Sequence, residues 1–474
     1  MLQRLLTGLV CLLFLFQSSA QTDIRFDIKN YSSDTMIVGY YLAEKMLVYD
    51  SLYREDGSTE FIIERDSLLD PGMYMVVSVP EGMFYQFLVN SEDQEFKMSI
   101  DTTLGLGVTF EGSEENGVFY EYLDFIDKAR KETDRIERVI AETDSVLVTV
   151  RQQLREDQMA INQAVGMKQN QVIENYPNSI VALLLNSNKP FDFPQFEGTP
   201  DEIQQKRYRI YKEKYFELMD MQHPAMLRTP IVDQRVNYYL DNLTPIDPDS
   251  AIASVDRILG LMEGNEDLYR YYLSTFLSKY GNSKYIGMDA VYVHLALNYY
   301  GKGRAPWITG ENLQEIITNA KRIEPILIGK PAPDFSIQSQ DGRTITLSEL
   351  DNEYTVLVFW KPNCGHCTKA MPHVIEFEKK WKDKGIQTIA ICTMTGKDFG
   401  KCWEDVKAKG MESLINAGDE FRKSRIFSKY YTTSTPKIFI IDKDKNIKIK
   451  KVPAENLDAV MESLMKMDAA EAGQ

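Results

Sequence analysis

The sequence predicts a multidomain chain: an N-terminal all-β sandwich-like domain, an α-helical middle domain and a C-terminal α/β domain. Three observations predict this order. The chain has 474 residues, too many for one ordinary core. Hydrophobic residues alternate with polar ones over 21–112 and then recur at helical spacing over 113–327. Over 328–474, strand-like and helix-like segments alternate.

The first twenty residues have the pattern of a targeting signal. Arg4 gives a positive start, residues 5–16 are largely apolar, and Ser18-Ser19-Ala20 offers small residues for cleavage. We therefore expect a signal peptide over 1–20 and export to the periplasm or cell envelope. An uncleaved membrane anchor is the alternative. No later run predicts a membrane span.

The next two regions contain no catalytic constellation. In 21–112, Ile24, Phe26 and Ile28 alternate with polar residues, which predicts strands of a small sandwich with a structural or partner-binding role. In 113–327, apolar residues recur near heptad spacing at Leu147, Leu154, Ile161 and Val165. These helices could present a groove to client proteins, although packing in a core explains the same residues.

The most informative stretch is Cys364-Gly365-His366-Cys367. It follows the apolar run 356–360 and precedes a helix-like segment. A dithiol in this setting is typical of thiol–disulfide chemistry, because a helix N-terminus stabilises the thiolate. We predict that Cys364 attacks a disulfide and that Cys367 resolves the mixed disulfide.

The elements around this motif complete an α/β pattern. We expect a strand–turn–strand over 335–347, a strand over 386–392, a charged helix over 397–409, a strand beginning at Thr435-Pro436, a hairpin to 451 and a helix over 457–467.

This arrangement resembles the thioredoxin fold, and in particular the periplasmic TlpA-like thiol–disulfide oxidoreductases. The resemblance covers 328–474 and rests on the cysteine motif, on Trp360 four residues before it, on Pro372 five residues after it, and on Thr435-Pro436 at the family's cis-proline position. The whole chain also resembles TlpA-like proteins with an N-terminal β-domain and a helical middle region. The resemblance implies that Trp360, Thr435 and Pro436 bind the substrate and that the Pro436 peptide bond is cis.

Two positions depart from the family pattern. Thioredoxins carry a buried acid where this chain has Val358, and some TlpA-like reductases carry a glutamate where it has Ala370. The proton acceptor of Cys367 is therefore not visible in the sequence. Glu376 and Glu378 lie further along the helix, and neither is a convincing candidate.

His366 bears on the direction of exchange. A histidine between the cysteines stabilises the thiolate of Cys364 and raises the reduction potential, and protein disulfide isomerase shares the Cys-Gly-His-Cys motif. Thioredoxin and the isomerase differ by about 90 mV, or roughly 4 kcal/mol. The resemblance favours reduction slightly over oxidation or isomerisation, whereas His366 argues the other way.

Other interpretations of the motif are weaker. The two cysteines could form a static disulfide. They could also bind zinc, but the sequence has no second Cys-x-x-Cys and no suitably spaced histidine pair to complete four ligands. No cysteine has a peroxidase setting. The runner-up function is a non-enzymatic envelope protein that uses the fold as a scaffold. For Cys392 and Cys402 we expect two packed thiols, with a second disulfide or an auxiliary redox pair as the alternative.

Composition limits the partners. Lys and Arg number 54 against 70 Asp and Glu, a net charge of −16, which argues against nucleic acid and anionic membranes. We expect protein disulfide or dithiol clients and an envelope redox partner that supplies or accepts electrons. The sequence indicates neither a cofactor nor a metal.

Overall fold

The computed structural model describes residues 21–55, 58–79, 82–101, 107–143 and 147–472. The predicted signal peptide lies outside these residues. The chain forms two compact units: one holds the chain up to Leu243 with Leu261–Leu268, and the other holds Thr244–Gly260 and the chain from Tyr269 onward. Helices of the middle region belong to both units, and the boundaries at 112 and 327 remain predictions. Among the described residues, no helix is long and apolar enough to cross a membrane.

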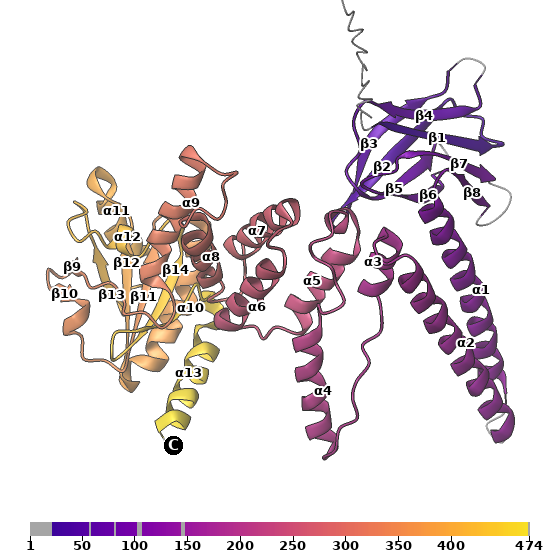
Figure 1. Cartoon of the computed structure of the whole chain (residues 1–474). Helices are drawn as coiled ribbons and strands as arrows, with labels where there is room; N and C mark the ends of the chain where they lie inside the picture. Colours follow the sequence, from indigo (N-terminus) through magenta and orange to yellow (C-terminus); the bar gives the residue numbers. More distant parts are fainter. Residues whose placement is uncertain (1–20, 56–57, 80–81, 102–106, 144–146, 473–474) are drawn as a thin grey trace, which may run out of the picture. The chain divides into compact units, whose positions relative to one another are not determined.

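The described N-terminal residues of the first unit form two β-sheets, as the alternation predicts (Figure 1). Their strand orders are β4-β1-β7-β8 and β3-β2-β5-β6; β1 and β7 are parallel, and the other pairs are antiparallel. The rings of Phe26 and Phe87, one from each sheet, meet at 5.3 Å between centroids, so the core lies between the sheets. The strands are β1 (Thr22–Lys29), β2 (Thr35–Leu42), β3 (Lys45–Tyr53), β4 (Glu60–Arg65), β5 (Gly72–Ser78), β6 (Phe84–Val89), β7 (Glu95–Asp101) and β8 (Val108–Glu111).

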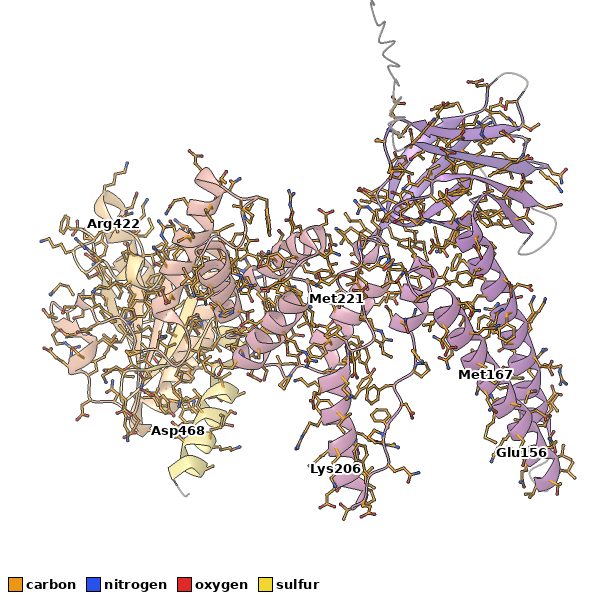
Figure 2. The ribbon with its side chains drawn as sticks, in the orientation of Figure 1. Glu156, Met167, Lys206, Met221, Arg422 and Asp468 are labelled. Carbon is orange, nitrogen blue, oxygen red and sulfur yellow. A yellow bond between two sulfur atoms is a disulfide. The ribbon has the colours of Figure 1, made fainter. Side chains whose placement is uncertain are left out.

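Three helices of the first unit, α1, α3 and α4, begin at side-chain caps. The Ser113 hydroxyl accepts a hydrogen bond from the Asn116 amide at the start of α1, and the buried Asn116 side chain bonds both backbone groups of Leu88 in β6. Ser179 caps α3, and its hydroxyl accepts a hydrogen bond from the Ala182 N–H. The predicted heptad face of α2 is only partly buried, and Met167 of that helix is exposed (Figure 2). The bounds are α1 (Glu114–Glu142), α2 (Val148–Asn175), α3 (Ile180–Ser187), α4 (Pro200–Lys214), η1 (Met226–Arg228) and α5 (Ile231–Asn242).

The second unit contains helices followed by a mixed sheet. The helical elements are α6 (Pro248–Leu261) and α7 (Glu266–Gly281), which fall mostly in this unit, then α8 (Asp289–Leu295), the π-helical η2 (Ala296–Tyr300), α9 (Gly310–Ile323) and η3 (Glu324–Ile326). The sheet has the order β10-β9-β13-β12-β11-β14-β15 among the described residues. β11 pairs with β12 in parallel and with β14 antiparallel.

The elements of this sheet domain follow the predicted order. They are β9 (Ser336–Ser339), β10 (Thr344–Thr346), η4 (Leu347–Glu349), β11 (Tyr354–Trp360), α10 (Gly365–Trp381), η5 (Lys382–Lys384), β12 (Ile386–Cys392), η6 (Gly396–Asp398), α11 (Gly400–Ala408), β13 (Ile415–Gly418), α12 (Ile426–Lys429), β14 (Lys437–Asp442), β15 (Ile447–Lys450), η7 (Ala454–Asn456) and α13 (Leu457–Ala472).

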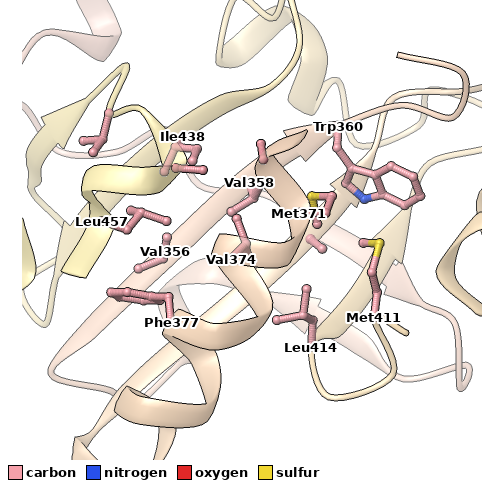
Figure 3. Close-up of a cluster of buried hydrophobic side chains, with 14 of the residues drawn as sticks. Val356, Val358, Trp360, Met371, Val374, Phe377, Met411, Leu414, Ile438 and Leu457 are labelled. Atoms are coloured by element: carbon pink, nitrogen blue, oxygen red, sulfur yellow. The ribbon is translucent and has the colours of Figure 1, made fainter. Parts of the chain in front are cut away.

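β11 is buried on both faces and organises the core. Val356 and Val358 point to α10, where they meet Val374 and Phe377 (Figure 3). Phe359 belongs to the cluster on the opposite face. A strand covered on both faces explains the continuous apolar run in the sequence, and it anchors the end that leads to Cys364.

The structure corrects one expectation about the cysteines. Cys392, at the end of β12, and Cys402, on α11, form a disulfide rather than two packed thiols. Both residues are fully buried in the same cluster as Trp360. The parallel pairing of β11 and β12 and the return of the chain through α11 bring the two Cα atoms to 6.1 Å, within the range that a disulfide spans.

Candidate functional site

The first cysteine lies between the end of a strand and the start of a helix. β11 ends at Trp360, and Cys364 is the N-cap residue of α10. The Cys364 sulfur accepts a hydrogen bond from the Cys367 backbone N–H at 3.3 Å. Both thiols are free: Cys364 is half-buried, whereas Cys367 is buried within the first turn of the helix. This geometry leaves Cys364 as the more accessible sulfur.

The loop before β14, the antiparallel neighbour of β11, completes the surroundings of Cys364. The Thr435–Pro436 peptide bond is cis, as the resemblance implies. The Cys364 thiol donates to the Thr435 carbonyl at 3.5 Å, and the Thr435 hydroxyl donates to the same sulfur at 3.7 Å. The predicted residues Cys364, Cys367, Thr435 and Pro436 are thus brought together.

The two sulfurs differ in acidity. Burial acts to raise the pKa of Cys364, but hydrogen bonds from Cys367, from Thr435 and from the backbone N–H of His366 outweigh it and hold the pKa below its usual value. Burial and the bond to Cys364 raise the pKa of Cys367. At a given pH the thiolate therefore resides mainly on Cys364.

This contrast predicts a pH dependence that is sensitive to Thr435. In the reduced protein, the alkylation rate of Cys364 should rise with a midpoint below the usual thiol pKa of about 8.5. Thr435→Val removes the hydroxyl that stabilises the thiolate, so the midpoint should move up, by about half a pH unit. Mass spectrometry of iodoacetamide-treated protein measures this rate. Thr433→Val, a nearby exposed change, is the control, and an identical midpoint in both variants would contradict the role of Thr435.

Trp360 requires a correction. It stands beside the motif in the sequence, but its side chain is fully buried in the core cluster with Met371. A ring with no accessible surface does not contact a client. Its predicted substrate-binding role is therefore not supported by its position, and packing of the strand end beneath the cysteines explains it better.

His366 and the distant glutamates occupy different environments. His366 is exposed at the first turn of α10, and its backbone N–H, together with that of Cys367, helps to lower the pKa of Cys364. Glu378 is buried and accepts a hydrogen bond from the Thr388 N–H at 3.1 Å, and burial raises its pKa. It lies eleven residues after Cys367, or roughly 16 Å along the helix axis. Glu378 therefore does not take the proton of Cys367 directly.

A lysine that the sequence patterns did not single out follows the cis-proline. Lys437 is buried, and its ammonium donates to the carbonyls of Tyr430 and Tyr431 at 3.1 and 2.6 Å. The Tyr431 hydroxyl in turn donates to Asn319 of α9 at 3.2 Å. The sequence signal for this lysine was a charged residue at the start of an otherwise apolar strand. No sequence signal pointed to the contact between Tyr431 and Asn319 of α9, because more than a hundred residues separate them.

Comparisons with known proteins agree with this geometry. Residues 328–450 match the AhpC/TSA family. The thiol-disulfide oxidoreductase ResA of a Bacillus cereus strain is 30% identical over 146 residues, which cover 30% of this chain and 79% of that protein. The thioredoxin-like protein YneN of Bacillus subtilis (strain 168) is 27% identical over 134 residues, 28% of this chain and 75% of YneN.

Among solved structures, a thioredoxin-like protein from Bacteroides caccae ATCC 43185 aligns with a TM-score of 0.44 and 17% identity, covering 58% of this chain and 98% of that one. The match to ResA spans most of that protein, and the residues matched by the AhpC/TSA family include the cysteine motif of this chain. Through its C-terminal third, the chain therefore belongs to the TlpA-like family of thioredoxin-fold thiol–disulfide oxidoreductases that includes ResA.

Proposed function

We propose that the protein is an exported enzyme that exchanges disulfides with client proteins through Cys364 and Cys367, with reduction favoured over oxidation or isomerisation. The observation that carries this proposal is the contrast between the two sulfurs: an accessible thiol of lowered pKa and a buried thiol of raised pKa, one helical turn apart. Members of the family are thiol–disulfide oxidoreductases, so the non-enzymatic alternative has no support.

The reaction balances as two successive exchanges. The Cys364 thiolate attacks one sulfur of a client disulfide; a mixed disulfide forms, and the other client sulfur leaves as a thiolate and takes a proton. Cys367 then loses its proton and attacks Cys364, which releases the second client sulfur. The client gains two electrons and two protons, and the enzyme ends with a Cys364–Cys367 disulfide. A dithiol protein of the envelope would return the enzyme to its reduced form.

Export rests on two observations. Residues 1–20 have the composition of a signal peptide. The Cys392–Cys402 disulfide supports the same location, because such bonds persist in oxidising compartments and are rare in the cytosol. An oxidising compartment also requires an electron donor if the enzyme acts as a reductase.

The reduction potential of the Cys364–Cys367 pair tests the proposed direction. Purified protein is equilibrated with glutathione buffers, and the free thiols are counted by alkylation. A potential near about −270 mV supports a reductase, whereas one near about −180 mV or above indicates an oxidant or isomerase. A pair that never titrates would contradict disulfide exchange altogether.

Two substitutions at His366 separate its two contributions. His366→Ala removes the imidazole and keeps the backbone N–H, whereas His366→Pro also removes the N–H that bonds Cys364. Proline is tolerated in the first turn of a helix. We expect His366→Ala to lower the potential by about 30 mV, and His366→Pro to lower it further, because each loss destabilises the thiolate. His373→Ala, on the same helix, is the control. Potentials that do not change would refute the tuning role.

A further inference from the structure

A pocket of about 1290 Å³ opens beside the cysteine site within the second unit. One wall carries His366 and Lys369 of α10 with Thr435 and Pro436. Thr435 is the residue that contacts the Cys364 sulfur. The pocket therefore extends to the residue that contacts the Cys364 sulfur, and its occupant would lie close to a disulfide that Cys364 attacks.

The opposite wall comes from helices that precede the thioredoxin-like domain in the chain. Leu277 of α7, Tyr292 of α8 and Ile316 and Ile323 of α9 contribute to it, and they pack around a small helical core. Hydrogen bonding between Tyr431 and Asn319 joins this wall to the loop before the cis-proline. The site is thus a cleft with one reactive wall and one partly apolar wall, rather than an open surface.

The charge of the pocket is opposite to that of the chain. Four lysines and two carboxylates line the pocket: Lys369, Lys437, Lys450, Lys451, Asp289 and Glu455. Two histidines and three tyrosines also line it. The whole chain carries −16. Positive charge concentrated in a concave site on an acidic protein favours an anionic occupant.

Two of these lysines are buried with few counter-charges. Lys450 is 1% exposed, and its ammonium lies 2.8 Å from Asp289, which Lys451 also approaches at 3.5 Å. Lys437 donates only to backbone carbonyls, and burial with the nearby charges of Lys451 and Lys450 lowers its pKa to about 8. One carboxylate therefore serves several ammonium groups, and a bound anion would lower the repulsion among them.

The size of the cleft indicates a peptide segment. Sites for small ligands have about 300–1,000 Å³, which is less than this volume. Lys369 is exposed on α10, two residues after Cys367. A client residue next to the attacked cysteine would lie close to this position. Among the described residues, no carboxylate forms an ion pair with Lys369. The rim thus offers a cation within reach of the reacting disulfide.

We propose that this cleft binds an acidic segment of the client polypeptide, so that the enzyme selects disulfides flanked by aspartate or glutamate. This inference rests on the proposed exchange function and adds the class of substrate. The helices α7, α8 and α9 then act as a specificity element, with Lys369 and Lys451 as positioning residues for the acidic side chains.

The test uses the pre-reduced full-length protein in single turnovers, so that no other reductant is needed. Three disulfides are compared: two cyclic peptides of equal length whose single disulfide is flanked by glutamates or by lysines, and the neutral 2-hydroxyethyl disulfide. We expect the glutamate peptide to be reduced about five- to tenfold faster than the lysine peptide, as partly screened ion pairs allow. The ratio should shrink in about 0.5 M NaCl.

Matched variants assign the preference to the cleft. Lys369→Gln/Lys451→Gln should bring the ratio of the two peptide rates close to one. Lys379→Gln/Lys466→Gln removes the same charge from exposed positions outside the cleft and should keep the ratio. Ser278→Trp, at an exposed lining position of α7, should slow both peptides relative to 2-hydroxyethyl disulfide.

The possible failures are distinct. A wild-type protein that reduces none of the three disulfides would overturn the proposed function. A protein that reduces all three, with equal rates for the two peptides, would overturn the acidic selection alone. The same conclusion would follow if the Lys369→Gln/Lys451→Gln variant kept the full preference.

Discussion

Replacing Cys364 with serine should abolish disulfide exchange, with a fall in rate of at least about 10³-fold. A serine hydroxyl does not ionise near neutral pH and makes no disulfide. Cys367 cannot replace it, because its side chain is 1% exposed and burial raises its pKa. The rate at which the pre-reduced protein reduces 2-hydroxyethyl disulfide measures the loss, and circular dichroism shows that the variant is folded.

Cys367→Ser is the matched variant, and its expected result is different in kind. Cys364 should still attack, but no thiol remains to resolve the product, so a mixed disulfide with the substrate should accumulate. Intact mass spectrometry detects the added mass, and dithiothreitol should remove it. If Cys364→Ser formed the stable adduct while Cys367→Ser formed none, the two roles would be reversed.

Asp289→Ala should destabilise the second unit by about 3–5 kcal/mol. The substitution leaves Lys450 buried at 1% exposure without its carboxylate, and Lys437 close by. Removing one partner of a buried ion pair lowers the free energy of unfolding by more than the intact pair contributes to it, because the remaining charge stays buried without water or a counter-charge. Guanidinium unfolding measures the change in the transition of this unit, since two units need not unfold together.

Two further variants identify the cause. Asp249 lies in the first turn of α6, as Asp289 lies in the first turn of α8, but its carboxylate is exposed. Asp249→Ala should therefore lower the free energy of unfolding by no more than about 1 kcal/mol. The double variant Asp289→Leu/Lys450→Met removes both charges and should regain most of the stability. If Asp289→Ala cost no more than Asp249→Ala, the ion pair would have no structural importance.

Local pattern was sufficient for most of the thioredoxin-like domain. The apolar run before Cys364, the hairpin turn at Asp341-Gly342 and the strand after Pro436 are each decided by residues within a few positions of one another. β13 was not anticipated. Its sequence, Ile415–Gly418, has one β-branched residue in four, and the strand forms because β12 and β9 lie on either side of it.

The site was predictable only where its parts are close in sequence. The cysteines could be placed, whereas the wall made by α7, α8 and α9 and the pairing of Asp289 with Lys450 depend on contacts across more than a hundred residues. Nearness in sequence also misled: Trp360 is four residues from Cys364 yet points into the core. The Cys392–Cys402 disulfide likewise depends on how α11 returns to the sheet.

Because of the salt bridge between α8 and β15, we expect the last third of the chain to be less stable as an isolated fragment than within the whole chain. A shortened protein that began at residue 328 would keep the cysteines and the sheet, but Lys450 would lose Asp289. Such a fragment would display the intrinsic reactivity of the dithiol without the helical wall beside it. The client preference that we propose would then depend on α7, α8 and α9 as much as on the redox motif itself.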